Sequence, residues 1–342
     1  MNSELRSSLL RAGALLLASY GLFYFSYKYY VPIRADFYRY YPMYQRPLDF
    51  TAATAPFVYR QVSAVITHAL YLTGIFYPED ISFKDPDIDQ RMFFSALLAN
   101  YLGLLLAAIV AGRIAELKTG SFSFSLIAGL LCLISFHTQT AVITGLTDGI
   151  SWFFVAALYL LYLRGARLLF LVLLVLSIFQ REIISLVFIL LGSFALLLGS
   201  GEKRQNVFVL ACAGTCFAAY LLLRTVIIAA PGYEFQLSLA SVLANVLSPY
   251  AVSLRAVVLQ GFMSQNVIFI AAAAHAALWL KAREMPREFL VLFFTFVALA
   301  AIGLADGIGV NIGRIGGMLS PAFAALAAAA LWRLERLAQN AS

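Results

Sequence analysis

The sequence predicts an all-α membrane protein, a bundle of about ten spanning helices, and three observations support this fold class. Of the 342 residues, 62% are hydrophobic and only 12% are charged, whereas a soluble domain carries about a quarter charged residues. The apolar residues form runs close to the ~20 residues that a spanning helix needs. The basic residues cluster between these runs, so membrane topology accounts for the net charge of +7 and no nucleic-acid partner is expected.

Ten apolar runs are expected to cross the membrane within a single domain, 1–342. They cover residues 9–29, 92–112, 121–138, 149–163, 168–181, 183–199, 207–229, 262–280, 289–305 and 317–333. The fifth run is short, so its hairpin with the sixth is expected to turn just below the outer surface. Two further apolar segments, 52–76 and 236–259, contain polar residues and prolines and suit helices at the membrane interface.

The basic residues between the runs predict the orientation. Short cytoplasmic loops are enriched in lysine and arginine, and alternate loops of this chain each carry at least two such residues. These are Arg113 and Lys118; Arg164 and Arg167; Lys203 and Arg204; Lys281, Arg283 and Arg287; and Arg333 with Arg336. A multi-pass protein of a bacterial inner membrane with both termini in the cytoplasm is therefore expected. Most acidic residues then fall on the outer face.

The loop 30–91 is the longest between two runs, and long structured loops usually serve a function. It opens with Arg34-Ala35-Asp36-Phe37-Tyr38-Arg39-Tyr40-Tyr41-Pro42. The flanking arginines favour an ionised Asp36, which can accept a proton from an incoming hydroxyl group. The alternative is that Asp36 is a surface residue in a tyrosine-rich interfacial belt.

This stretch resembles the first outer loop of C-type membrane glycosyltransferases (the GT-C superfamily). Protein O-mannosyltransferases and lipid A aminoarabinose transferases place Asp-Glu-x-Arg-Tyr just after the first span. Asp36, Arg39 and Tyr40 match this motif, and Phe37 replaces its glutamate. The resemblance implies that Asp36 is the catalytic base or lies beside the acceptor, that Arg39 and Tyr40 contact substrate, and that the donor is a sugar on a polyprenyl phosphate.

Asp85, Asp87 and Asp89 lie immediately before the second run. An Asp-x-Asp pair can hold a divalent cation, because hard cations prefer carboxylate oxygens. Acidic residues at a helix start also cap free N–H groups and favour the helix dipole. Capping is the favoured interpretation, no metal ligand is assigned, and a divalent cation stays open as a cofactor.

Arg181 and Glu182 interrupt apolar sequence between the fifth and sixth runs. Ionisable residues at membrane depth are costly and mark functional sites. Adjacent side chains on a helix point apart, so each is expected to have a different partner. Arg181 can grip a phosphate group through its planar guanidinium. The alternative is a structural ion pair with Asp148, which is itself either a helix N-cap or a site residue.

Three further arginines are candidates for contacts with lipid phosphate or headgroups. Arg314 lies in a glycine-rich outer loop, and Arg255 precedes the eighth run. Arg60 heads the apolar segment after Pro56 and is expected to reach towards lipid headgroups.

The sequence has no glycine-rich phosphate loop and no soluble nucleotide-binding domain, so a donor must arrive through the membrane. The function expected is transfer of a sugar from a polyprenyl-phosphate carrier to a lipid or small-glycan acceptor on the non-cytoplasmic face, among membrane lipids. The alternative is a transporter or flippase that uses the same arginines to carry an anionic or lipid-linked substrate.

Overall fold

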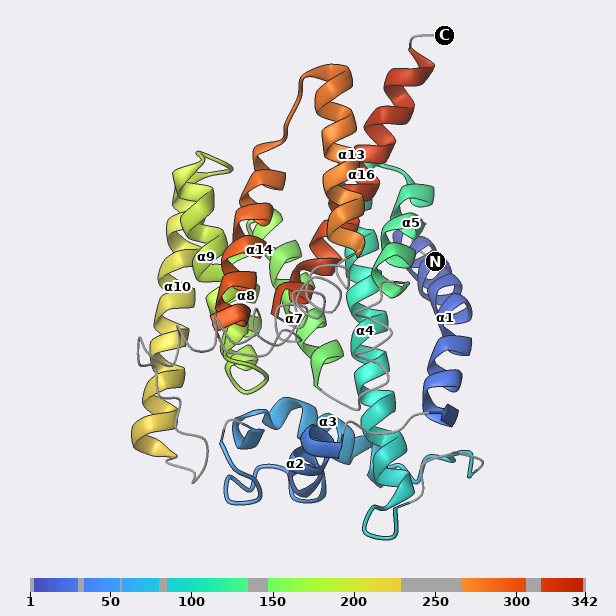
Figure 1. Cartoon of the computed structure of the whole chain (residues 1–342), viewed down its shortest axis with the longest axis vertical. Helices are drawn as coiled ribbons and strands as arrows, with labels where there is room; N and C mark the ends of the chain where they lie inside the picture. Colours follow the sequence, from blue (N-terminus) through green and yellow to red (C-terminus); the bar gives the residue numbers. More distant parts are fainter. Residues whose placement is uncertain are drawn as a thin grey trace, which may run out of the picture.

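The computed structural model describes residues 3–29, 34–55, 57–79, 85–134, 147–228, 266–305 and 315–340. Every regular element in these ranges is a helix (Figure 1). The elements are α1 (Ser3–Tyr29), α2 (Arg34–Gln45), η1 (Phe57–Tyr59), α3 (Gln61–Leu72), α4 (Gln90–Thr119), α5 (Phe122–Leu133), α7 (Asp148–Leu163), α8 (Arg167–Ile178), α9 (Ile183–Leu197), α10 (Lys203–Leu222), η2 (Leu223–Ile227), α13 (Asn266–Ala282), α14 (Arg287–Ala305), η5 (Gly317–Leu319) and α16 (Ser320–Gln339).

A helix lies at each of the ten predicted apolar runs, which confirms the all-α class. Four helical segments within the described residues are long and apolar enough to cross a membrane by length and composition: Arg6–Tyr29, Gln90–Thr119, Lys203–Ile227 and Gly317–Gln339. The other helices at the runs are mostly shorter. The protein is thus an all-helical membrane protein, and the number of its spans stays a prediction.

Helix α4 is central to the bundle and contacts α1, α3, α5, α7 and α16. Its start is capped by Asp89, whose carboxylate accepts the N–H groups of Arg91 at 2.8 Å and Met92 at 3.3 Å. Its end is closed by Gly120 at φ 66°, where the backbone donates to the carbonyl of Glu116. The predicted capping role of the aspartate run is therefore confirmed at Asp89.

Two glycines allow α4 and α7 to pack backbone against backbone. A Cβ atom on Gly149 would lie 2.1 Å from the carbonyl oxygen of Asn100, and one on Gly103 would lie 2.5 Å from the backbone nitrogen of Ile150. This close approach brings Asn100 beside the start of α7, and Gly149 N–H donates to its side-chain oxygen at 2.6 Å.

Helices α2 and α3 lie across one end of the bundle rather than along it (Figure 1). The backbone N–H of Val62 in α3 donates to the carbonyl of Phe179 at 3.0 Å, which joins this layer to the end of α8. His68 in α3 contacts the carbonyl of Tyr44 in α2 at 2.8 Å. The helix expected within 52–76 is thus α3, whereas α2 was not predicted. Segment 236–259 lies outside the described residues.

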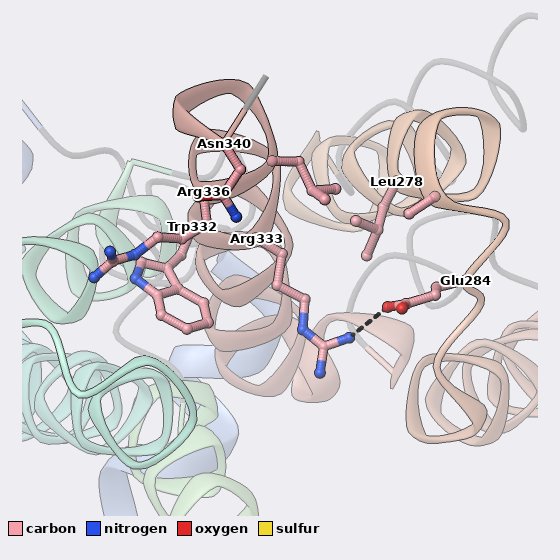
Figure 2. A pocket seen from close by; sticks show the side chains of 8 residues that line it. Leu278, Glu284, Trp332, Arg333, Arg336 and Asn340 are labelled. Carbon is pink, nitrogen blue, oxygen red and sulfur yellow. Dashed lines mark hydrogen bonds and ion pairs between the residues drawn. The ribbon is translucent and has the colours of Figure 1, made fainter. Parts of the chain in front are cut away.

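The opposite end of the bundle gathers the basic loops predicted to be cytoplasmic. Contacts between these loops put them on one side: Lys118 with Glu288, Arg287 with the carbonyl of Gly199, Arg167 with Glu202, and Arg333 with Glu284. Arg11, which is only 1% exposed, joins α1 to this end through Glu116 at 2.6 Å. A pocket between α13 and α16 opens at the same end (Figure 2).

Replacing Gly149 with alanine should destabilise the protein, because the new methyl group would force α4 and α7 apart. Overpacking of this kind costs about 1–3 kcal/mol. Gly214 in α10 is the matched control, since a Cβ there meets no atom within 4 Å. The measurement is the thermal midpoint of Gly149→Ala and Gly214→Ala in detergent. Equal midpoints would contradict the described α4–α7 contact.

Candidate functional site

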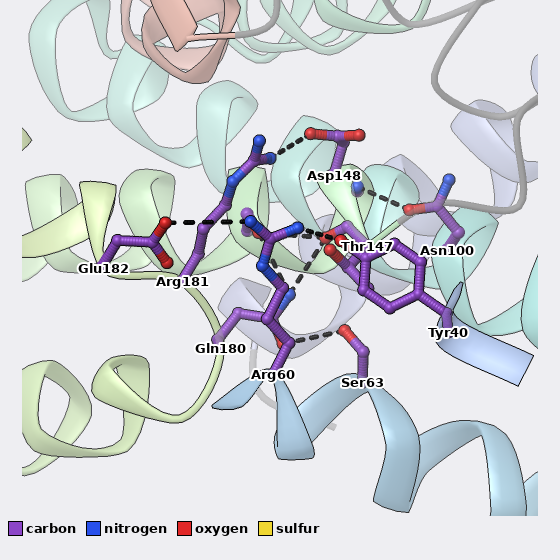
Figure 3. Close-up of polar contacts among 11 residues, drawn as sticks. Tyr40, Arg60, Ser63, Asn100, Thr147, Asp148, Gln180, Arg181 and Glu182 are labelled. Atoms are coloured by element: carbon purple, nitrogen blue, oxygen red, sulfur yellow. Dashed lines mark hydrogen bonds and ion pairs between the residues drawn. The ribbon is translucent and has the colours of Figure 1, made fainter. Parts of the chain in front are cut away.

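A buried layer of charged and polar side chains lies between the α2–α3 pair and the ends of α7, α8 and α9 (Figure 3). Its centre is the connection between α8 and α9, which includes Arg181 and Glu182. The guanidinium group of Arg181 donates to the carboxylate of Asp148, and the two residues are 7% and 1% exposed. Asp148 is the first residue of α7, where a negative charge also suits the helix dipole, and Thr147 takes the N-cap position instead.

Arg60 joins the α2–α3 pair to this centre. It occupies the N-cap position of α3, is 7% exposed, and donates a hydrogen bond to the hydroxyl of Tyr40 in α2. Its other terminal nitrogen lies 3.8 Å from a carboxylate oxygen of Glu182. The expectation that Arg60 reaches out to lipid headgroups is therefore wrong, because protein carboxylate and phenol groups hold it inside.

As expected from their adjacency, Arg181 and Glu182 have different partners, Asp148 and Arg60 (Figure 3). The structural alternative proposed for Arg181, an ion pair with Asp148, is present. Contact between Arg181 and a phosphate group stays a prediction. The Asp148 hydrogen bond engages Nη1, and a guanidinium group carries five N–H donors, so donors remain for a second anion.

Side-chain amides complete the layer. Gln180, which is fully buried, donates to the carbonyl of Thr147 and to the hydroxyl of Ser151, each at 3.0 Å, and accepts from Ser63 at 2.8 Å. One side chain thereby joins α3, α7 and the α8–α9 connection. Such a satisfied network holds its members in one arrangement.

The length of α8 explains why the layer lies inside the protein. Its 12 residues extend roughly 18 Å, short of the ~30 Å hydrocarbon core. A turn of the α8–α9 connection just below the outer surface, expected from the short fifth run, is compatible with this length and stays a prediction; α8 stops at Ile178 rather than at 181. Irregular backbone at such depth must be covered by protein. Helix α3 supplies that cover through the Val62–Phe179 hydrogen bond.

Two hydroxyl groups at the layer have no hydrogen-bond partner within the described residues. Thr147 Oγ and the phenol of Tyr220 are buried, and the two residues are 1% and 2% exposed. The ring of Tyr220 lies edge-on to Tyr59 at 5.9 Å. Burial of a polar group without a partner is costly, so these hydroxyls are candidates to bind a polar ligand.

Tyr44 of α2 shows that this helix lies close to the charged centre. Complete burial raises the pKa of its phenol well above the usual value, and the nearby negative charge of Asp148 raises it further. Tyr44 is therefore a neutral hydrogen-bonding group at neutral pH.

Helix α2 carries the motif-bearing residues Asp36, Arg39 and Tyr40. Asp36 lies in its first turn, and its side chain is outside the part of the chain that the structure describes. Arg39 is exposed and lies 5.2 Å from the ring of Phe57. Tyr40 is fully buried and contacts Arg60. The motif is therefore fixed to the charged layer through Tyr40.

The remaining candidates divide into two groups. Arg255 and Arg314 lie outside the described residues. Asp85 accepts a hydrogen bond from Tyr38, and Asp89 caps α4 and accepts from Tyr71 at 2.9 Å. The described residues contain no group of three or more His, Cys, Asp or Glu side chains arranged to hold a metal ion.

Sequence reasoning missed Asn100, Gln180 and the unpartnered hydroxyls. Asn100 had a usable signal, because an amide inside the apolar run 92–112 needs a partner. The signal for Gln180 was weaker: it directly precedes Arg181 in the sequence. Tyr220 and Thr147 had none, because hydroxyl groups are common in such runs and caps.

Comparison with known proteins gives limited information. No family model matches the sequence, and no curated protein matches it. Among solved structures, ArnT from Cupriavidus metallidurans in the apo state aligns over 94% of this chain and 77% of its own, with 12% identity and a TM-score of 0.44. Similarity at this level does not extend to activity.

Removing only one member of the Arg181–Asp148 pair should destabilise the protein more than removing both charges. A buried carboxylate left without its cation costs about 3–5 kcal/mol, whereas neutral replacement of both can be nearly neutral. The variants are Arg181→Gln, Asp148→Asn and the double substitution, compared by thermal midpoint in detergent. A double variant as unstable as the sum of the single variants would contradict the pairing.

Proposed function

We propose that this protein is a membrane glycosyltransferase of the GT-C type, which moves a sugar from a polyprenyl-phosphate carrier to a lipid or small-glycan acceptor on the non-cytoplasmic face. The observation that carries the proposal is the hydrogen bond between Tyr40 and Arg60. It fixes the helix that bears the Asp-x-x-Arg-Tyr stretch onto a buried layer that contains Arg60 and Arg181.

In the proposed reaction Asp36 accepts the proton of the acceptor hydroxyl, or orients that hydroxyl for attack on the sugar. The carrier phosphate leaves with negative charge. Fixed cations stabilise such a leaving group, a role we assign to Arg181, Arg314 and Arg255, with Arg39 beside the substrate. The hydroxyls of Thr147 and Tyr220, which have no partner among the described residues, suit hydrogen bonds to sugar or phosphate oxygens.

The placement of the charged layer favours an enzyme over the alternative of a transporter. Arg60, Asp148, Arg181 and Glu182 all lie at the end of the bundle that α2 and α3 cover. The opposite end holds its own ion pairs, including Lys118–Glu288 and Arg333–Glu284. A site confined to one end suits chemistry on one face of the membrane.

Asp36→Asn should lower sugar transfer by about 10²–10⁴-fold without unfolding the protein, because the amide keeps the shape but cannot accept the proton. The matched control is Asp49→Asn, in the same loop, where the carboxylate binds Thr51 and Arg46. Turnover of a polyprenyl-phosphate sugar by purified protein is the measurement. Near-normal transfer by Asp36→Asn would rule out Asp36 as the base. Binding of the lipid-linked sugar without transfer by the wild type would instead favour a transporter.

The α2–α3 end is expected to face outwards and the basic end inwards. Cysteines placed at Gln45 and Lys203, each exposed, report on the two ends in a variant that lacks Cys132, Cys212 and Cys216. An impermeant thiol reagent applied to intact spheroplasts should label position 45 and spare position 203. The reverse labelling pattern would place the candidate site in the cytoplasm and overturn the proposed reaction.

A further inference from the structure

We propose that the pocket between the end of α13 and the last turns of α16 binds the headgroup of an anionic phospholipid. The pocket has a volume of about 310 Å³ and lies at the basic end of the bundle, opposite the α2–α3 pair. Its lining includes Glu284 after α13, and Trp332, Arg333 and Arg336 of α16 (Figure 2). This site is separate from the proposed glycosyltransferase site and does not depend on it.

The pocket lies where two predicted membrane spans end. The apolar runs 262–280 and 317–333 are predicted to end at residues 280 and 333. The lining residues fall at 278–284 and 332–340, so they straddle both ends. The pocket therefore lies at the level where the hydrocarbon core gives way to headgroups. Basic pockets between helices at this level bind anionic headgroups.

The two arginines that line the pocket, Arg333 and Arg336, have N–H groups that can bind an anion. Arg336 lies 5.6 Å from the ring of Trp332 and has no carboxylate partner within the described residues. Stacking on the ring face leaves the N–H groups at the guanidinium edge available to donate, which suits a phosphate group. Arg333 lies 3.3 Å from Glu284, and both side chains are more than half exposed, at 51% and 61%. Such an exposed pair is weak and can exchange its carboxylate for a phosphate.

The surface beside the pocket combines a further arginine with exposed apolar side chains. Arg283 follows α13 with a φ of 56°, in the left-handed region that few arginines adopt, and its guanidinium lies 5.2 Å from the ring of Trp279. The same turns expose apolar side chains, with Trp279 44%, Leu280 67% and Leu331 37% exposed. Tryptophan and arginine together are typical of the membrane interface. The pocket thus combines cations for a headgroup with an adjacent surface for acyl chains.

The test compares lipids and variants on the full-length protein in detergent. The probes are short-chain phosphatidylglycerol, short-chain phosphatidylcholine and inorganic phosphate, with binding followed by tryptophan fluorescence and by native mass spectrometry. Arg336→Gln should weaken phosphatidylglycerol binding about fivefold, since one basic side chain near a headgroup contributes about this much. Glu284→Gln should strengthen it, because Arg333 then has no competing carboxylate.

The matched control is Arg204→Gln, which removes one exposed positive charge at the same end of the bundle but outside the pocket. It should leave phosphatidylglycerol binding unchanged. Equal losses for Arg336→Gln and Arg204→Gln would mean general electrostatic attraction and would overturn the proposal. So would equal binding of the two lipids, or full displacement of phosphatidylglycerol by millimolar phosphate.

Discussion

The buried ion pair between Arg181 and Asp148 constrains the rest of this fold. Taking these charges out of water is costly, and only close pairing with further hydrogen bonds offsets that cost. The pair requires the start of α7 to meet the α8–α9 connection. Gly149 follows Asp148 directly and, with Gly103, lets the backbones of α4 and α7 touch. The position of Asp148 therefore also depends on the packing of α7 against α4. Helix α3 then covers the connection and supplies Arg60 for Glu182.

This arrangement gives the two ends of the bundle different characters. At the basic end the ion pairs are mostly partly exposed and join the ends of different helices, as with Lys118–Glu288 and Arg167–Glu202. Water screens such pairs, and they set orientation more than stability. At the α2–α3 end the charges are mostly buried and paired with named partners. Two hydroxyl groups there, of Thr147 and Tyr220, have no partner within the part of the chain that the structure describes. The buried pairs of the α2–α3 end hold charged groups in fixed positions, as chemistry requires.

The sequence predicted most of the local structure because local rules determine it. Apolar runs located the helices, and Asp89 was identified as a cap from its place before α4. Contacts between distant segments were not predictable. Nothing near Arg60 in the chain indicates that its side chain contacts Tyr40 and Glu182 inside the protein. Helix α2 contains Pro42 and three charged residues, so its sequence does not read as an apolar helix. Of the candidate site, the sequence identified the charged members, but it missed Gln180 and Asn100, which join them.

The proposed function requires that a lipid-linked phosphate binds at the buried charged layer. Hydrogen–deuterium exchange of the purified protein with and without a polyprenyl phosphate tests it most directly, since it reports on backbone segments without assuming an activity. We expect slower exchange in α2, in α3 and in residues 180–183 when the lipid is present, with α14 unchanged. Unchanged exchange in those three segments under saturating lipid, or protection confined to the basic end, would contradict it.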